Sequence, residues 1–182
     1  MRPTRGPALL VMLLTALGCG PGEQEQKRAP KAAETLPDQV AHDVTQVVTR
    51  DGRKRAEITA TRLLKFERDR LSHLEGDVTV RFYGHGGRLV STLTSQRAVI
   101  DEGRRIFTAV DSVVLINFDA TVLHTDTLRW EESADKIFGP SRVTIDRKEG
   151  REVGVGFEAE SDLSSWTLME VVTTLVPTDS TR

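Results

Sequence analysis

The stretch Val78-Thr79-Val80-Arg81-Phe82 places an apolar side chain at every second position and a polar one between them. Successive side chains of a β-strand point to opposite faces, so this pattern predicts a strand with one buried face. The same period of two recurs in residues 113–116, 121–128, 143–145 and 153–157. β-Branched residues are frequent in these runs, and glycine-containing turns separate them. The pattern therefore predicts an all-β domain.

Two shorter patterns and a repeat add detail to this domain. Phe138-Gly139-Pro140 predicts a turn, because glycine and proline interrupt strands, and residues 162–165 are a candidate helical turn. Residues 59–66 resemble residues 94–101 at an offset of 35, and residues 124–130 follow at a further 30. A repeated β unit of this kind predicts stacked antiparallel hairpins that bury one common interior.

Residues 1–18 have the features of an export signal. Arg2 and Arg5 precede the uncharged run 8–17, which is too short for a bilayer span of about 20 residues. The run closes as Ala16-Leu17-Gly18-Cys19, which resembles the bacterial lipobox that directs a lipid onto the cysteine. Cys19 is the only cysteine of the chain, and it has no disulfide partner in an oxidising compartment. We therefore expect Cys19 to carry a lipid; an ordinary signal peptide with a chance cysteine is the alternative.

Composition divides the remainder of the chain. Residues 19–38 are rich in Pro, Gly, Glu, Gln, Lys and Ala, which predicts a flexible tether. Residues 39–176 are the expected β-domain, and residues 177–182 are a C-terminal tail. Without Arg2 and Arg5, 23 basic and 27 acidic side chains remain, so the net charge is −4. This balance does not suggest a nucleic-acid partner.

The sequence shows no pattern that indicates catalysis or metal binding. The four histidines form no His-x-His or His-x-x-x-His pair of the kind that binds metals. A nucleophile elbow and a phosphate-binding glycine loop are also missing. We therefore expect no enzyme, no cofactor and no metal site.

Three segments together resemble the LptC family of the lipopolysaccharide export system. They are residues 74–80, residues 123–130 and Glu152-Val153-Gly154-Val155-Gly156-Phe157. In the family these are a glycine before an alternating strand, an L-x-T-D-x-L-x-aromatic strand and a V-x-G-x-G-F strand. The resemblance covers residues 40–170 and implies a twisted, open β-jellyroll, which the soluble partner LptA shares. Well-known members begin with a membrane-spanning helix, whereas a lipid on Cys19 would anchor this chain.

The resemblance implies an apolar interior that covers the acyl chains of lipopolysaccharide. The candidate groove residues are Val78, Val80, Phe82, Val113, Leu115, Val143, Ile145, Gly156 and Phe157. Plain core packing is the alternative for the apolar residues, and a bulge that curves the sheet is the alternative for Gly156. The apolar residues of strand 113–118 lie on both faces, so the sequence leaves open which face points inward.

The resemblance also implies partners. The chain would pass lipopolysaccharide from an inner-membrane ABC transporter to an LptA-like bridge protein, and both would join the jellyroll by strand addition. The candidate partner edge is residues 166–176, with Trp166, Leu168 and Val171; a paired inner strand is the alternative.

The expected location is the periplasmic side of the inner membrane. The outer membrane is the alternative, because Gly20 and not an aspartate follows the cysteine. Two rival functions stay open. One is an envelope scaffold lipoprotein with edge-to-edge β pairing and no lipid cargo, and the other is an enzyme-accessory or substrate-binding lipoprotein.

Overall fold

The computed structural model describes residues 36–84 and 86–175. Nine strands follow one another in this part of the chain, which contains no helix. Their bounds are β1 Gln39–Arg50, β2 Arg53–Phe66, β3 Leu71–Tyr83, β4 Leu89–Asp101, β5 Ile106–Asn117, β6 Val122–Glu131, β7 Lys136–Arg147, β8 Gly150–Glu160 and β9 Trp166–Leu175.

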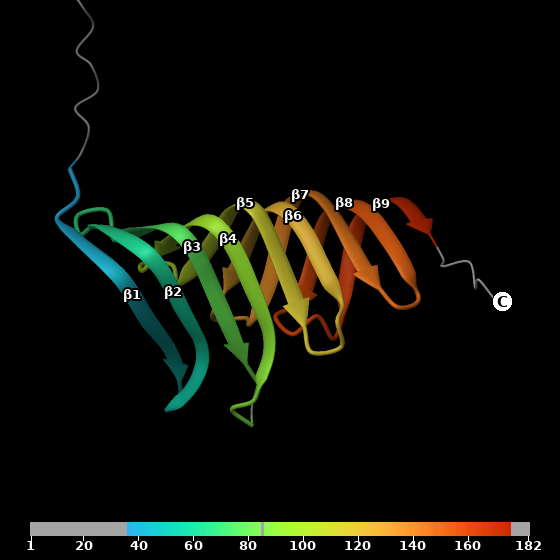
Figure 1. Cartoon of the computed structure of the whole chain (residues 1–182), viewed down its shortest axis with the longest axis horizontal. Coiled ribbons are helices and arrows are strands. Elements are labelled where there is room, and N and C mark those ends of the chain that lie inside the picture. Colours follow the sequence, from blue (N-terminus) through green and yellow to red (C-terminus); the bar gives the residue numbers. More distant parts are fainter. Residues whose placement is uncertain (1–35, 85, 176–182) are drawn as a thin grey trace, which may run out of the picture. The chain divides into compact units, whose positions relative to one another are not determined.

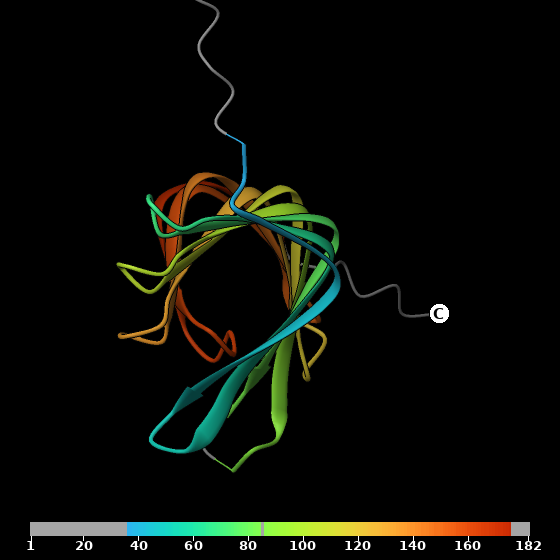
Figure 2. The same cartoon turned by 90° about the vertical axis from the view of Figure 1, so that its left-hand side faces the viewer.

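All nine strands belong to one antiparallel sheet, and their order in the sheet is their order in the sequence. Figure 1 shows the strands stacked side by side. Figure 2, seen from the β1 end, shows the sheet rolled around a common interior. The predicted all-β, open jellyroll of stacked antiparallel hairpins is confirmed.

A row of β-bulges bends the strands near their midpoints. The pairing register shifts once in the middle of each pair from β2–β3 to β7–β8. Gly76-Asp77 and Asp111-Ser112 supply two of these bulges, with φ values of 73°, 48°, 67° and 53°. Glycine adopts positive φ without strain, and aspartate tolerates it better than most residues do. Because a bulge bends its strand and increases the twist, the row rolls the sheet up.

The internal repeat corresponds to this architecture. Residues 59–66, 94–101 and 124–130 lie in β2, β4 and β6, which are alternate strands of the sheet. The two bulges at Gly76 and Asp111 are separated by the same offset of 35 residues. One hairpin of the roll is therefore one copy of the repeat.

Two local predictions are wrong. Phe138-Gly139-Pro140 is not a turn but lies within β7, where the register with β8 shifts between Gly139 and Arg142. A bulge tolerates proline because the ladder is already interrupted there. Residues 162–165 form no helical turn. Leu163 has a φ of 55°, and its side chain is buried in the core.

Apolar side chains fill the inside of the roll from β2 to β8. The largest that are fully buried are Phe82, Phe157, Leu74, Leu93, Leu115, Leu123, Leu128, Ile137, Ile145, Leu163, Val78 and Val80. Complete burial of each such side chain contributes roughly 1.5–3 kcal/mol to folding. This core fixes the curvature that positions the candidate site.

Candidate functional site

Eight of the nine candidate groove residues face the interior. These eight, which are at most 1% exposed and belong to one hydrophobic cluster, are Val78, Val80, Phe82, Val113, Leu115, Val143, Ile145 and Phe157. The orientation of β5 is also settled, because Val113 and Leu115 point inward whereas Ile116 and Phe118 are 45% and 76% exposed. The structure brings the predicted residues together, and their contact with lipid stays a prediction.

Gly156 differs from the other eight. It adopts a φ of 71°, and a β-carbon there would lie 3.0 Å from Cγ of Met169 in β9. At the nearby Gly154, a β-carbon would lie only 2.6 Å from the backbone oxygen of Glu170. Both glycines therefore let β9 pass close to β8, which supports the alternative reading of a bulge with close strand contact.

A cleft of about 330 Å³ opens at the β1 end of the roll. It lies between the second half of β1, the first half of β2, the ends of β4 and β6 and the start of β5. Its apolar lining includes Val48, Ile58, Ile100, Phe107 and Trp130, of which the last four are at most 9% exposed. These four are members of the main core, so the core approaches solvent at this cleft.

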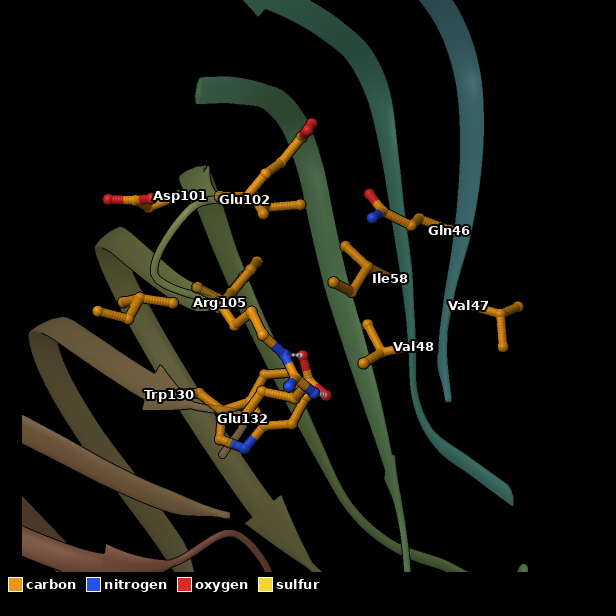
Figure 3. A pocket seen from close by; sticks show the side chains of 12 residues that line it. Gln46, Val47, Val48, Ile58, Asp101, Glu102, Arg105, Trp130 and Glu132 are labelled. Carbon is orange, nitrogen blue, oxygen red and sulfur yellow. Dashed lines mark hydrogen bonds and ion pairs between the residues drawn. The ribbon is translucent and has the colours of Figure 1, made fainter. Parts of the chain in front are cut away.

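Neighbouring residues of β1 point to opposite sides at this cleft. Val47 and Val48 both border the cleft, but in Figure 3 the side chains of Val48 and Ile58 point toward Trp130, whereas that of Val47 projects from the other side of β1. Val48 packs against the core, and Val47 is 49% exposed. The alternation of a strand thus gives the cleft one inner and one outer valine on adjacent positions.

Charged groups at the mouth of the cleft are paired. The Arg105 guanidinium donates to both carboxylate oxygens of Glu132, with Nε 3.0 Å from Oε2 (Figure 3). This hydrogen bond, together with the carboxylate charge, raises the pKa of Arg105 above its usual value. Glu102 accepts a hydrogen bond from Ser72 at 3.0 Å and lies 3.4 Å from Nζ of Lys65. The mouth is therefore polar and internally neutralised above an apolar floor, an arrangement that suits an amphiphile.

A second cavity has a more polar lining. It has a volume of about 620 Å³ and is lined by the β5–β6 turn, the β7–β8 turn and the loop before β9. Trp166 lines it, donates from Nε1 to Glu152 at 3.1 Å, and lies 5.2 Å below the guanidinium of Arg147. Its ring is held in place by these two neighbours.

The candidate partner strand, β9, is last in the strand order and pairs with β8 alone among the described strands. It is thus an edge strand of this sheet and not an inner strand. Trp166 and Leu168 pack against the core, whereas Met169 and Val171 are 71% and 62% exposed. The described side chains of the strand therefore include two that pack against the core, Trp166 and Leu168, and exposed ones such as Met169 and Val171.

The cleft residues Ile58, Ile100, Phe107 and Trp130 were not among the sites predicted from sequence. Trp130 ends the L-x-T-D-x-L-x-aromatic segment, and the other three share the period of two. That signal marks them as buried. It does not show that strands β1, β2, β4, β5 and β6 meet at one opening, because this depends on how the sheet rolls.

The predicted export signal, Cys19 and most of the tether lie outside the described residues. The described residues contain no helix that is long and apolar enough to cross a membrane. They also contain no cluster of three or more His, Cys, Asp or Glu side chains placed to hold a metal ion.

Comparison with known proteins gives a family. Residues 8–176 match the family described as "Lipopolysaccharide-assembly, LptC-related". Among solved structures, the chain is similar to LptH of Pseudomonas aeruginosa, described as the LptA-homologous periplasmic component of the lipopolysaccharide transport device. That similarity has 11% identity and a TM-score of 0.45, and it covers 73% of this chain and 82% of LptH. No curated protein matches the chain. The family match covers most of the sequence, and the chain therefore belongs to the LptC-related family of lipopolysaccharide-assembly proteins, which are periplasmic transport components and not enzymes.

Proposed function

We propose that this chain is a membrane-anchored, lipopolysaccharide-binding component that passes lipopolysaccharide from an inner-membrane ABC transporter to an LptA-like bridge protein. The observation that carries the proposal is the cleft at the β1 end, whose apolar floor is continuous with the core of the roll. An acyl chain in this cleft leaves water, while the saccharide stays at the paired charges of the mouth.

The energetic requirement for such a site is large. Each methylene moved out of water contributes about 0.8 kcal/mol, so a dozen methylenes on one acyl chain would cost on the order of 10 kcal/mol to expose. A groove lined by valine, isoleucine and aromatic rings meets this cost without specific polar contacts. The floor of the cleft has this composition.

The two ends of the roll fit a direction of transfer. The cleft lies beside β1, and β9 ends the sheet at the other side. We assign the β1 end to the transporter and β9 to the bridge protein, because exposed sheet edges accept additional strands. Cargo would then enter at the cleft and leave at β9.

Photocrosslinking in growing cells tests the cargo. A photoreactive amino acid at Val48, which points into the cleft, should give lipopolysaccharide adducts, and the same residue at Val47, whose side chain points away from the cleft, should give far fewer (Figure 3). Crosslinkers at Phe82 and Phe157 then test whether cargo reaches the deep core. Equal adduct yields at positions 47 and 48 would contradict a cleft-bound lipid.

The filled interior favours one alternative. The eight deep groove candidates are already packed against other side chains, as an envelope scaffold lipoprotein without lipid cargo would require. Such a protein would pair edge to edge with its neighbours and give no lipid adduct at Val48. The same crosslinking experiment therefore separates the two functions.

The anchor has its own test. Replacing Cys19 with serine should abolish lipid labelling and release the protein into the soluble fraction, because several acyl chains hold a protein to a bilayer firmly. A Cys19→Ser protein that stays with the membrane would show that protein contacts provide the anchoring. Separation of inner and outer membranes then locates the wild-type protein.

A further inference from the structure

The rolled sheet is closed along one line by side chains alone. We call this line the seam: along it the β1–β2 hairpin, residues 50–55, faces the β6–β7 turn, residues 132–135 (Figure 2). Among the described strands, only two strands that follow one another in the sequence have Cα atoms within 8 Å of each other. The seam therefore has no strand pairing, in contrast to the continuous ladder of the rest of the roll.

Two arginines of the β1–β2 hairpin bridge the seam. Arg50 donates from Nη2 to the backbone carbonyl of Glu132, and Arg55 donates from Nη2 to the Asp135 carboxylate. The Arg55 side chain is 11% exposed and that of Asp135 is 26% exposed. An ion pair with this little water contact is stronger than an exposed one, and loss of one partner leaves a poorly solvated charge.

Asp135 joins this bridge to two other parts of the roll. Its Oδ1 accepts hydrogen bonds from Ser161 Oγ at 3.2 Å and from Trp130 Nε1 at 3.4 Å. Ser161 in turn accepts a hydrogen bond at its carbonyl from Ser91 Oγ at 2.5 Å. Asp135 thus accepts hydrogen bonds from three side chains, Arg55, Ser161 and Trp130, and Arg50 makes a second bridge across the seam.

The same contacts reach the cleft. Trp130 lines the cleft and also contacts the Phe82 ring edge to face, with the centroids 5.1 Å apart. Cargo at Trp130 is therefore adjacent both to the seam and to the filled core. Because the core residues are almost completely buried, a chain longer than the cleft requires the two walls to separate. They separate most easily where only side chains hold them.

We propose that the Arg55–Asp135 ion pair and the Arg50–Glu132 hydrogen bond form a latch that holds the seam closed, and that this latch opens when lipopolysaccharide enters the roll. The proposal rests on the proposed function. The β1–β2 hairpin moves away from the β6–β7 turn, the interior widens, and the strand ladder of β2 to β9 stays intact.

Spin-label distances across the seam test the latch. The full chain with Cys19→Ser has no other cysteine, so labels go on Arg53→Cys and Ala134→Cys, two exposed positions on opposite sides of the seam. A control pair, Asp69→Cys with Ala134→Cys, spans turns that the continuous ladder connects. Adding purified lipopolysaccharide should lengthen the 53–134 distance and leave the 69–134 distance unchanged.

A charge-neutral variant tests whether the ion pair of Asp135 holds the seam closed. Asp135→Asn keeps the shape of the side chain but removes the anion, so the 53–134 distance should lengthen without lipopolysaccharide, and crosslinking from Val48 should increase. Asp111→Asn, which removes the anion paired with Arg97 away from the seam, is the matched control and should change neither. Lipopolysaccharide adducts at Val48 together with an unchanged 53–134 distance would overturn the latch alone. A complete lack of adducts at Val48 would overturn the proposed function and the latch with it.

Discussion

Gly139 and Phe157 show how one residue decides the packing of a neighbour. They are cross-strand partners in β7 and β8, and a β-carbon on Gly139 would lie 2.1 Å from Cε1 of the Phe157 ring. The ring thus occupies the space that any side chain at position 139 needs. We expect Gly139→Ala to lower the free energy of unfolding by about 1–3 kcal/mol, because Phe157 must leave its position in the core. Urea denaturation measures this.

Gly86→Ala is the matched control, because a β-carbon there meets nothing within 4 Å. The free energy of unfolding of this variant should stay within about 0.5 kcal/mol of the wild-type value. Equal denaturation midpoints for the position 139 and position 86 variants would show that Phe157 relaxes at no cost.

Another single residue, Glu57, makes a pH-dependent contribution to the stability of the fold. Hydrogen bonds from Lys54 at 2.8 Å and Arg81 at 3.1 Å, with Lys54 the larger cause, hold the pKa of Glu57 below its usual value. A carboxylate with a lowered pKa stabilises the fold above the usual glutamate pKa of about 4.3, and the contribution is lost as the pH falls through the lowered pKa.

Glu57→Gln should therefore be less stable than the wild type near neutral pH, and the difference should shrink on acidification below about pH 4.3. Thermal unfolding at a series of pH values measures it. Glu149→Gln is the comparison, because the Glu149 side chain has no hydrogen bond or ion pair with another described residue. A stability difference for Glu57→Gln that is constant with pH would contradict the assignment.

At the scale of one element, the described side chains of β9 combine core-packed residues with exposed ones. Deleting the strand from Trp166 onward would remove two residues that pack against the core, so a loss of partner binding would not be interpretable. Val171→Pro changes an exposed residue, leaves Trp166 and Leu168 in place, and disturbs the edge to which a partner strand would add. We expect this variant to lose co-purification with the bridge protein while it still unfolds cooperatively.

Val47→Pro is the matched control for that experiment. Val47 lies in β1, the other edge strand, and is similarly exposed. It should leave bridge-protein binding unchanged and weaken binding to the transporter. Normal bridge-protein binding by Val171→Pro would remove β9 from the proposed interface.

Across the whole roll, stability should be lowest in the two edge strands, β1 and β9. The described side chains of β1 and β9 include no fully buried residue, whereas each strand from β2 to β8 contributes to the core. Local opening costs little where few apolar contacts are lost. Amide hydrogen exchange, measured by mass spectrometry, should therefore be fastest in β1 and β9 and slowest in β4 to β6. Uniform protection across the nine strands would show instead that the roll opens only as a unit.

The sequence alone determined the all-β class, the hairpin repeat and most of the inward-facing residues. These properties depend on local alternation, which a short window contains. Val78, Val80 and Phe82 were predicted to be buried on one face, and they are. The family was also readable, because the segments at 74–80, 123–130 and 152–157 keep their order along the chain.

Only the tertiary structure decided the inward face of β5, the position of Gly139-Pro140 within a strand, the cleft and the latch. Alternation cannot choose between two apolar faces, and a glycine–proline pair is compatible with a turn and with a bulge. The latch joins Arg55 to Asp135 across 80 residues of sequence. That contact exists because a row of bulges rolls the sheet until the β1–β2 hairpin meets the β6–β7 turn. The curvature that brings them together accumulates over many strands, so it cannot be read from the sequence of any single strand.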